Sequence, residues 1–360
     1  MCRASIVDHS FWEGKKVFLT GHTGFKGSWL SIWLNSMGAK VTGYSLYAPT
    51  TPSLFELGNV EDVLVESVRG DVTDLDMLKL SLHKTNPEIV IHMAAQPLVK
   101  KSYEDPVHTY KTNVMGTVNV MEAARTCNSV RVILNVTTDK CYENKEWYWG
   151  YRENESLGGY DPYSSSKACA ELITSAYRQS FFKTTDIKVA TARAGNVIGG
   201  GDWAEDRLIP DIIRAMIEQG QIQIRNPEAV RPWQHVLDPL YGYLLLCQHL
   251  YLKGVEYAQA WNFGPQETDV RSVDWVVNQM LKKWPFKHQG YKAIKQDDWH
   301  ESNVLKLDSS KAFKELGWTP RWKLDKSLSS TIEWVIQYLD GKDLKELCIK
   351  QIAEYENTEW

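Results

Sequence analysis

A tyrosine and a lysine four positions apart form the strongest chemical pattern in the chain. They are Tyr163 and Lys167, at the start of a segment with helical periodicity, and side chains at this spacing lie on the same face of a helix. A free tyrosine has a pKa of about 10 and is a weak base at neutral pH. Because a nearby ammonium favours the phenolate, the pair predicts a general base whose pKa Lys167 lowers. The alternative is two exposed side chains on a helix surface.

Three polar residues follow the apolar strand that precedes this helix. They are Thr138, Asp139 and Lys140, and the carboxyl end of a parallel strand is where catalytic groups gather. Thr138 can hydrogen-bond a substrate hydroxyl. Asp139 and Lys140 are adjacent titratable groups that can divide acid and base work between them. The alternative is a solvated turn.

A third pattern lies near the N-terminus, where the strand 17–20 runs into glycines and then into a helix expected over 28–37. Gly21, Gly24 and Gly27 follow the spacing G-x-x-G-x-x-G. The first allows a tight turn, the second lets a pyrophosphate approach the backbone, and the third lets helix and strand pack closely. The N–H groups of the first helical turn then face an anion. We therefore expect a nucleotide site at this end of the sheet.

These residues must be positioned by alternating strands and helices. The alternation predicts an α/β fold, a Rossmann-type doubly wound parallel sheet with ligands at the carboxyl ends of its strands. Expected strands span 17–20, 40–46, 63–69, 88–92, 131–136 and 188–192, and expected helices span 75–84, 106–127 and 162–182. In the second half, strands are expected at 234–236, returning to the sheet, and at 261–263, with helices at 207–219, 239–252, 273–284, 309–316 and, closing the chain, 324–339.

Composition narrows the function further. The 360 residues carry a net charge of −4, so no basic field invites nucleic acid. The six cysteines have neither metal-ligand spacing nor a disulfide framework, which favours a cytoplasmic protein without a metal site. No apolar stretch is typical of a signal peptide or a membrane span. The 15 Trp residues are expected in a core, a substrate cleft or an interface.

Taken together, the glycine loop, the threonine-bearing strand end and the Tyr/Lys helix resemble an extended short-chain dehydrogenase/reductase over nearly the whole chain. The Thr138-Asp139 pair resembles the nucleotide-sugar 4,6-dehydratases of that superfamily. The dehydratases that act on dTDP-glucose and GDP-mannose have Glu at the position after this pair. This chain has Lys140 there, which resembles the dehydratases that act on CDP-glucose. The stretches 193–203 and 231–236 carry the same resemblance.

The resemblance implies a role for each catalytic residue. Tyr163 would take the proton of the sugar 4-hydroxyl as hydride leaves C4 for NAD, with Thr138 orienting that hydroxyl and Lys167 binding the nicotinamide ribose. Asp139 would protonate the departing C6 hydroxyl, and Lys140 would handle the C5 proton. Hydride would then return to C6. The product would be CDP-4-keto-6-deoxyglucose, a precursor of 3,6-dideoxyhexoses in bacterial surface polysaccharide such as the O-antigen of lipopolysaccharide.

The resemblance also implies cofactor contacts. They are Gly21, Thr23, Gly24, Phe25, Lys26 and Gly27 along the pyrophosphate, Ser45 at the adenosine ribose, Asp71 and Val72 at the adenine, Ala94, Ala95 and Gln96 toward the nicotinamide, Asn113 beneath the active-site strand, and Tyr163 and Lys167. No acid ends the second strand to hold the ribose. His22 and Lys26 could instead accept the 2′-phosphate of NADP, and we expect NAD with NADP as the alternative.

The substrate contacts implied by the resemblance come mainly from the second half of the chain. They are Gln96, Asn196, Leu208, Arg231 and Glu301, of which Arg231 matches a diphosphate with its planar fork. We expect an NAD-binding Rossmann domain over 1–193, with returning segments near 234–262, and a mainly nucleotide-sugar-binding domain over 194–360.

Other functions stay open at this point. A UDP-N-acetylglucosamine 4,6-dehydratase can carry the same Asp-Lys pair, and another nucleotide-sugar dehydratase or epimerase shares the fold. A non-catalytic NAD(P)-sensing regulator is a remote alternative, because such proteins generally lose the Tyr/Lys pair. The segments 106–127 and 162–182 resemble the helices through which this superfamily forms homodimers, so a homodimer or homotetramer is expected.

Overall fold

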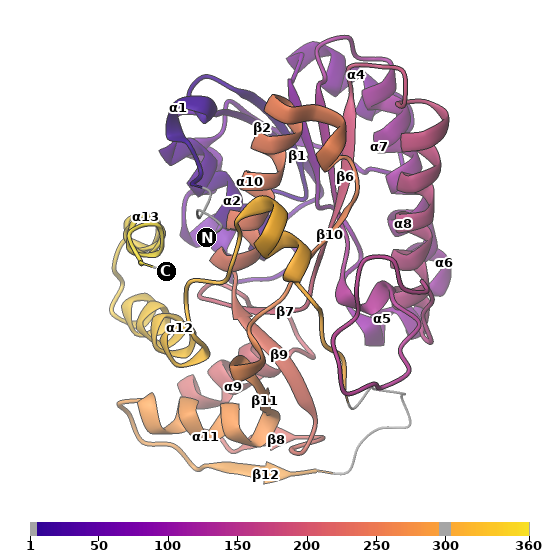
Figure 1. Ribbon diagram of the computed structural model, residues 1–360. Coiled ribbons are helices and arrows are strands. Elements are labelled where there is room, and N and C mark those ends of the chain that lie inside the picture. The colour runs from indigo at the N-terminus through magenta and orange to yellow at the C-terminus, as the bar shows by residue number, and fades with distance from the viewer. Residues whose placement is uncertain (1–5, 295–303, 360) are drawn as a thin grey trace.

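A seven-stranded parallel sheet forms the centre of the computed structural model, which describes residues 6–294 and 304–359 (Figure 1). The strand order is β10-β6-β5-β4-β1-β2-β3, and every neighbouring pair is parallel. The strands are β1 (Lys16–Thr20), β2 (Lys40–Ser45), β3 (Glu66–Arg69), β4 (Ile89–His92), β5 (Val132–Val136), β6 (Lys188–Ala194) and β10 (Ala260–Phe263). The predicted doubly wound Rossmann-type fold is confirmed.

The central strands β4 and β5 are buried along their whole length and mostly apolar, since helices cover both faces of the sheet. Alternate side chains of β4 and β5 enter different cores: Ile91 and Leu134 pack on one face, Val90 and Ile133 on the other. The first core is covered by α2 (Phe25–Ser36) and α10 (Leu237–Lys253), and the second by α4 (Leu75–Thr85), α7 (Gly116–Arg125) and α8 (Pro162–Ser180). This packing fixes the carboxyl ends of the strands, and the predicted site lies at those ends.

Two small sheets lie beyond that edge, at the lower end of Figure 1. One has the order β11 (Val270–Ser272), β9 (Val230–His235), β7 (Asn196–Ile198), and the other pairs β12 (Tyr291–Ala293) with β8 (Ile222–Ile224); α9 (Leu208–Ile217) and α11 (Val273–Lys283) lie beside them. The expectation that 234–236 returns to the large sheet is wrong, because β9 ends at His235 and belongs to a small sheet. Among the described residues that follow β6, only β10 joins the large sheet. The domain boundary near 194 stays a prediction.

Several shorter or later elements complete the chain. They are α1 (His9–Trp12), α3 (Leu54–Leu57), η1 (Val60–Val63), α5 (Val99–Glu104), α6 (Pro106–Tyr110), η2 (Lys111–Met115), η3 (Asp139–Cys141), η4 (Gly254–Tyr257), η5 (Glu267–Asp269), η6 (Ala312–Leu316), α12 (Leu324–Leu339) and α13 (Leu344–Glu356). The predicted helix 106–127 is therefore three pieces, with the π-helical η2 in the middle. A π-helical turn often marks a functional site.

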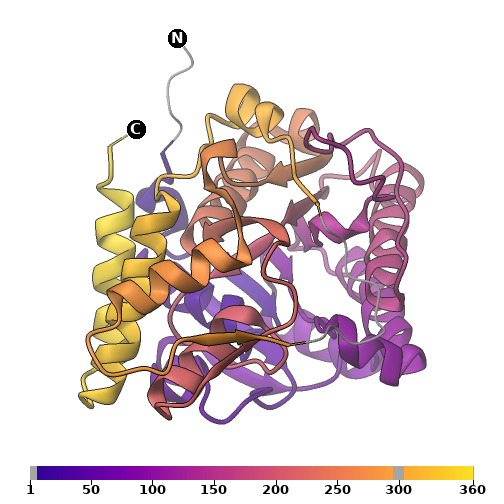
Figure 2. The ribbon, with the colours of Figure 1, turned by 90° about the horizontal axis from the view of Figure 1, so that it is seen from below.

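The prediction that 324–339 closes the chain is wrong, since α13 follows it. Gly341, with φ +65°, turns the backbone, and Asp343 caps α13 by accepting a hydrogen bond from the backbone N–H of Glu346. Figures 1 and 2 show α12 and α13 on the opposite side of the molecule from α7 and α8. The helix α13 packs against α2, so the last helix supports the one that follows the glycine loop.

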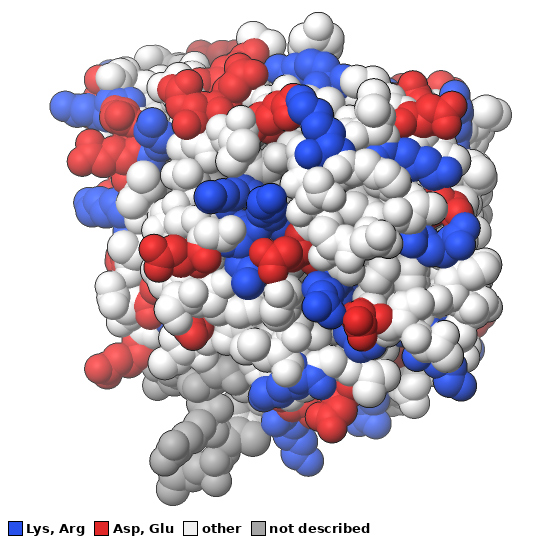
Figure 3. All heavy atoms as spheres, turned by 90° about the horizontal axis from the view of Figure 1, so that it is seen from above, with Lys and Arg blue, Asp and Glu red and all other residues white. Residues whose placement is uncertain are grey.

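The tryptophan and charged side chains can now be placed in the core and on the surface. Within the described part of the chain, six Trp side chains are fully buried, among them Trp29 and Trp33 of α2. Figure 3 shows acidic and basic side chains interspersed over the face seen from above. No helix among the described residues is long and apolar enough to cross a membrane.

Candidate active site

Helix α8 places Tyr163 and Lys167 at the carboxyl edge of the sheet. Asp161 fixes its start, because the carboxylate accepts hydrogen bonds from the backbone N–H (2.9 Å) and the hydroxyl (2.6 Å) of Ser164. Tyr163 and Lys167 are only 8% and 7% exposed. The Lys167 ammonium lies 3.4 Å from the Val136 carbonyl at the end of β5. The predicted pair is therefore buried in the site, and the exposed-surface alternative is wrong.

The charges around Tyr163 decide how readily it becomes a base. Burial raises the pKa of Tyr163 to about 12, while a hydrogen bond with Thr138 and the Arg207 guanidinium lower it. Asp139 and Asp161 raise it. Lys167 is not among these main influences, so its predicted tuning of Tyr163 stays a prediction. Burial lowers the pKa of Lys167 itself to about 8.

Thr138 and Asp139 lie together at the end of β5, where η3 begins. The Thr138 hydroxyl donates to an Asp139 carboxylate oxygen at 2.9 Å. Burial raises the pKa of Asp139, against the opposite effects of Lys140, of Thr138 and of Arg231. A raised pKa favours the protonated carboxyl that an acid catalyst needs. Lys140 is half-buried, in contrast to its two neighbours.

The glycine loop has the geometry of a tight turn against a helix. Gly21 has φ +79°, and a Cβ atom on it would lie 2.8 Å from the backbone nitrogen of Ala94. A Cβ atom on Gly27 would lie 2.1 Å from the Gly21 carbonyl oxygen. Gly24 caps α2 without a side chain, and the first N–H groups of a helix have no partner within it. The loop thus offers a backbone cradle for phosphate, with Phe25 and Lys26 in the first helical turn.

Lys26 extends from the glycine loop toward the reaction centre. Its Nζ atom donates to the Tyr243 hydroxyl at 3.0 Å. Burial lowers the pKa of Lys26 to about 7, with further lowering by Lys167 and Arg207, while Asp139 raises it. Sequence reasoning missed Tyr243 and Arg207, which no local motif marks. Arg207 is ion-paired to Asp202 at 3.0 Å.

The structure does not support His22 as a phosphate ligand. Its ring is fully buried and contacts Ser67 through Nε2 at 2.8 Å. Burial and the Arg69 charge lower the pKa of His22 to about 4, so the ring is neutral. With Lys26 bonded to Tyr243, neither residue proposed for a 2′-phosphate points to the adenosine end.

The remaining cofactor candidates follow the ends of β2, β3 and β4. The Ser45 hydroxyl meets that of Thr23 at 2.8 Å. Asp71 accepts a hydrogen bond from the Thr73 backbone N–H at 2.8 Å, forming a turn, and Val72 beside it is buried. Ala94 and Ala95 follow β4, and Ala94 lies against the glycine turn.

Gln96 and Asn113 connect this loop to helix α8. The Asn113 side chain accepts from the Gln96 backbone N–H (2.8 Å) and donates to the Gln96 carbonyl (3.1 Å) and the Ser166 hydroxyl (2.9 Å). The Gln96 amide is itself bonded to Leu98 and Thr109. Both side chains are buried with their polar atoms engaged, so their place in the site is a positioning one.

The predicted substrate contacts lie on the small sheets and α9. Asn196 is in β7, Arg231 is in the adjacent β9, and Leu208 begins α9. All three are half-buried. Arg231 is close enough to Asp139 to lower its pKa. Glu301 lies outside the described residues.

A buried ion pair between Glu171 and Arg193, which sequence reasoning missed, lies next to the predicted site. The Glu171 carboxylate, one turn beyond Lys167, accepts from Arg193 (2.8 Å), Thr137 (2.5 Å) and Thr191 (2.8 Å). Both charged side chains are almost fully inaccessible. Although burial raises the pKa of Glu171, the Arg193 guanidinium and these hydrogen bonds hold it below its usual range. The network joins α8 to β5 and β6.

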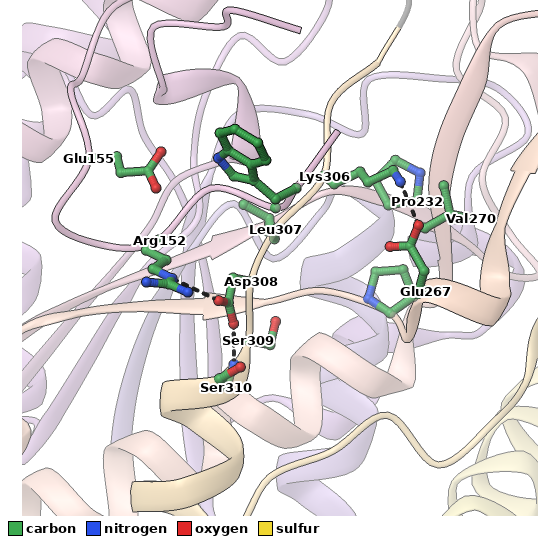
Figure 4. Close-up of a pocket in the computed structure, with 13 residues that line it drawn as sticks. Arg152, Glu155, Pro232, Glu267, Val270, Lys306, Leu307, Asp308, Ser309 and Ser310 are labelled. Atoms are coloured by element: carbon green, nitrogen blue, oxygen red, sulfur yellow. Dashed lines mark hydrogen bonds and ion pairs between the residues drawn. The ribbon is translucent and has the colours of Figure 1, made fainter. Parts of the chain in front are cut away.

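A separate cavity of about 680 Å³ lies behind β9 (Figure 4). Trp149, Arg152, Lys306 and Asp308 line it, and none of the predicted catalytic residues does. Its cations are paired, Arg152 with Asp308 at 3.0 Å and Lys306 with Glu267 at 2.5 Å. The predicted catalytic residues therefore lie outside this cavity. No cluster of potential metal ligands occurs among residues 6–294 and 304–359.

Comparisons with known proteins agree with this geometry. The family described as GDP-mannose 4,6 dehydratase matches residues 18–331. A CDP-glucose 4,6-dehydratase of Salmonella typhimurium is 50% identical, over 97% of this chain and 98% of the relative. A dTDP-glucose 4,6-dehydratase of Xanthomonas campestris is 24% identical, over 88% and 92%.

Solved structures show the same fold at lower identity. A dTDP-glucose 4,6-dehydratase from Streptomyces venezuelae, with NAD and TYD bound, has a TM-score of 0.78 at 22% identity, over 91% of this chain and 99% of that one. A UDP-glucose 4-epimerase from Thermotoga maritima, with UDP-glucose, has a TM-score of 0.75 at 21% identity, over 90% and 99%. With the match over 18–331 and the relative at 50% identity, the chain belongs to the GDP-mannose 4,6-dehydratase family of extended short-chain dehydrogenases/reductases.

Proposed function

We propose that the protein dehydrates CDP-glucose to CDP-4-keto-6-deoxyglucose, with NAD as a resident cofactor that each turnover regenerates. The observation that carries the proposal is the burial of Thr138, Asp139, Tyr163 and Lys167 together at one sheet edge. The relative at 50% identity, named as a CDP-glucose 4,6-dehydratase, supports this substrate over UDP-N-acetylglucosamine.

The chain fits a dinucleotide on the evidence of its own backbone. A Cβ atom on Gly21 would collide with the Ala94 backbone and one on Gly27 with the Gly21 carbonyl, so these glycines let the turn pack closely. A Cβ atom on Gly24 would have only the Gly21 carbonyl oxygen near it, at 3.4 Å, so this position leaves room for a pyrophosphate to approach the backbone. When bound, NAD would supply a hydride acceptor at C4 and later a hydride donor at C6. Thr23, Gly24 and Phe25 would hold the pyrophosphate, Ser45 the adenosine ribose, and Lys167 the nicotinamide ribose.

Tyr163 would serve as the base for the sugar 4-hydroxyl. Thr138, which lowers the pKa of Tyr163, would orient that hydroxyl. The Arg207 guanidinium lies near enough to favour the phenolate form. Burial excludes water from the phenol and strengthens these charge effects.

Asp139 and Lys140 would carry the elimination that follows. A 4-keto group acidifies the C5 proton, and Asp139, whose pKa burial raises, would protonate the departing C6 hydroxyl. Lys140 would handle the C5 proton directly or through water. Arg231 and Asn196 would bind the diphosphate, with Leu208 against the base and Gln96 beside the sugar.

The test is an assay with CDP-glucose and with UDP-N-acetylglucosamine, each with NAD. We expect CDP-glucose alone to give a 4-keto-6-deoxy sugar, detected by its absorbance in alkali. A product from UDP-N-acetylglucosamine alone would assign the other dehydratase activity. Tight NAD binding with no product from either sugar would favour a regulator.

Replacing Lys140 by glutamate is expected to change the elimination more than the oxidation. Lys140 is half-buried beside the buried Asp139, so the change reverses a charge next to the acid without opening the core. Single-turnover absorbance of the nicotinamide reports the first hydride transfer, and product formation reports the elimination. Unchanged turnover in the variant would remove Lys140 from the mechanism.

NAD affinity is expected to fall several-fold as the pH rises from 6 to 9. The Lys26 ammonium attracts the pyrophosphate, and since its pKa is about 7, it loses its charge through this range. The Lys26→Met variant should show a weaker pH dependence, measured by calorimetry. Lys167, with a pKa of about 8, titrates nearby, so an identical slope in the variant would assign the dependence to Lys167 instead.

We also propose that the protein is a homo-oligomer of the cytoplasm. Apolar side chains are exposed along α6 to α8, including Val107, Met115 and Leu172, and a homodimer through this face, alone or doubled to a tetramer, would cover them. Light scattering is expected to give two or four times the chain mass.

The cysteines that the structure describes are unpaired, and four of them are buried, which fits the reducing cytoplasm.

A further inference from the structure

The Asp139 carboxylate lies against the backbone where the chain crosses from the large sheet to a small one. Strand β6 ends at Ala194 and β7 begins at Asn196, so Gly195 alone joins them. A Cβ atom on Gly195 would lie 2.9 Å from the Asp139 Oδ2 atom, closer than real Cβ atoms approach another group. The carboxylate therefore occupies the space that a side chain at position 195 would take.

Pro232 of β9 bounds the same space from the small sheet. A Cβ atom on Gly195 would lie 3.3 Å from the Pro232 Cγ atom. Pro232 is buried, and its ring nitrogen has no N–H to donate. Carbon atoms therefore bound this side of the space beside Asp139, and burial raises the pKa of its carboxyl group. That direction favours the protonated form, which the proposed acid requires.

Thr138 fixes the other oxygen of the same carboxylate. Its hydroxyl donates to the Asp139 Oδ1 atom at 2.9 Å, and its hydroxyl oxygen accepts from the Lys140 backbone N–H at 3.4 Å. Asp139 is only 4% exposed. Because a carboxyl group is rigid and planar, a shift of Oδ2 away from Gly195 also moves Oδ1 relative to Thr138. The two contacts together define the orientation of the group.

The orientation of this carboxyl matters because the proposed elimination needs its proton at one atom. The C5 proton passes to Lys140, directly or through water, and the electron pair of the C5–H bond forms the C5–C6 double bond. The C6–O bond breaks, its electron pair stays on the oxygen, and the Asp139 proton converts the departing hydroxyl to water. Asp139 is left as a carboxylate. A misplacement of about 1 Å costs about 100-fold in the rate of such a step.

We propose that Gly195 is a positioning residue for the acid: its missing side chain, with the Pro232 ring beside it, sets where the Asp139 carboxyl delivers its proton. The inference rests on the proposed function, which gives Asp139 the acid role. Gly195 does not have a positive φ, so alanine meets no backbone strain at this position. The added methyl group would therefore act mainly on the carboxylate.

The test is Gly195→Ala, followed through a single turnover with CDP-glucose and NAD. Reduction of the nicotinamide is expected at a nearly unchanged rate, because Tyr163 and not Asp139 serves that step. Elimination should slow by about 10- to 100-fold, since the acid is displaced. The absorbance of the reduced nicotinamide should therefore persist, a signature that a general structural defect would not produce.

A double replacement shows whether Gly195 acts through the acid. Asp139→Asn keeps the shape of the side chain and removes its acidity, so adding Gly195→Ala should slow elimination by less than about twofold further. Gly220→Ala is the matched control, because a Cβ atom there would have only the Ala215 carbonyl oxygen near it, at 3.8 Å. This control should leave both steps unchanged.

The failures can be told apart. Elimination at full rate in Gly195→Ala refutes the positioning role, and the proposed function stands. Equal slowing of oxidation and elimination also refutes it, since Gly195 would then act on the whole site, as does equal slowing by Gly195→Ala with and without Asp139→Asn. If the unaltered protein neither reduces the nicotinamide nor forms a ketosugar from CDP-glucose, the proposed function fails, and this inference fails with it.

Discussion

Replacing Tyr163 by phenylalanine is expected to reduce ketosugar formation by about 100- to 10,000-fold, the range that a positioned acid–base group contributes. The phenol is 8% exposed and is hydrogen-bonded with the Thr138 side chain. Phenylalanine fills nearly the same volume, so the change removes the proton acceptor and leaves the packing. Oxidation at C4 then lacks a base, and the elimination that depends on the 4-keto group cannot begin.

The matched control is Tyr177→Phe on the same helix. Its hydroxyl donates to Glu122 at 2.9 Å, away from the site, and the variant should retain turnover. NAD binding measured for Tyr163→Phe should stay close to that of the unaltered protein, which separates lost chemistry from lost cofactor. Undiminished product from Tyr163→Phe would contradict the mechanism at its first step.

The parallel sheet could be predicted because its strands carry the signal locally. β4 and β5 are short apolar runs followed by polar residues, and only a strand buried on both faces is so uniformly apolar. The destination of a later strand is not a local property. Gln234 and His235 read as a strand, but their pairing with Val197 and Ile198 in the small sheet depends on contacts made elsewhere in the chain. Helix α13, by contrast, buries residues at helical spacing from Leu344 to Tyr355, so its existence is a local property of the sequence.

The same distinction explains the site. Tyr163 and Lys167 are four residues apart on one helix, so their spacing alone predicts that they meet. The environment of a side chain depends on distant segments. Lys26 follows the glycine turn in the sequence, but Tyr243, more than 200 residues away, determines where its ammonium lies. His22 looked like a candidate phosphate ligand, and burial against Gly43 and Ser67 makes it a neutral core residue.

Replacing Glu171 by leucine is expected to lower the free energy of unfolding by about 3–5 kcal/mol, the usual cost of removing one member of a buried ion pair. Arg193 would keep its charge in a site that is 4% exposed, without the carboxylate 2.8 Å away. Thr137 and Thr191 would each lose a buried acceptor as well. Chemical denaturation measures the change.

A double replacement shows whether the buried charge is the cause. Glu171→Leu combined with Arg193→Met removes both charges, and it should recover more than half of the lost stability, because two apolar side chains can replace a buried pair. The exposed pair Lys84–Glu66 is the control, where Glu66→Gln should cost less than about 1 kcal/mol. If the double variant is no more stable than Glu171→Leu alone, the hydrogen bonds to Thr137 and Thr191 carry the stabilisation instead. Since Thr137 precedes Thr138, which we propose orients the substrate hydroxyl, that result would tie the stability of the fold directly to the placement of Thr138.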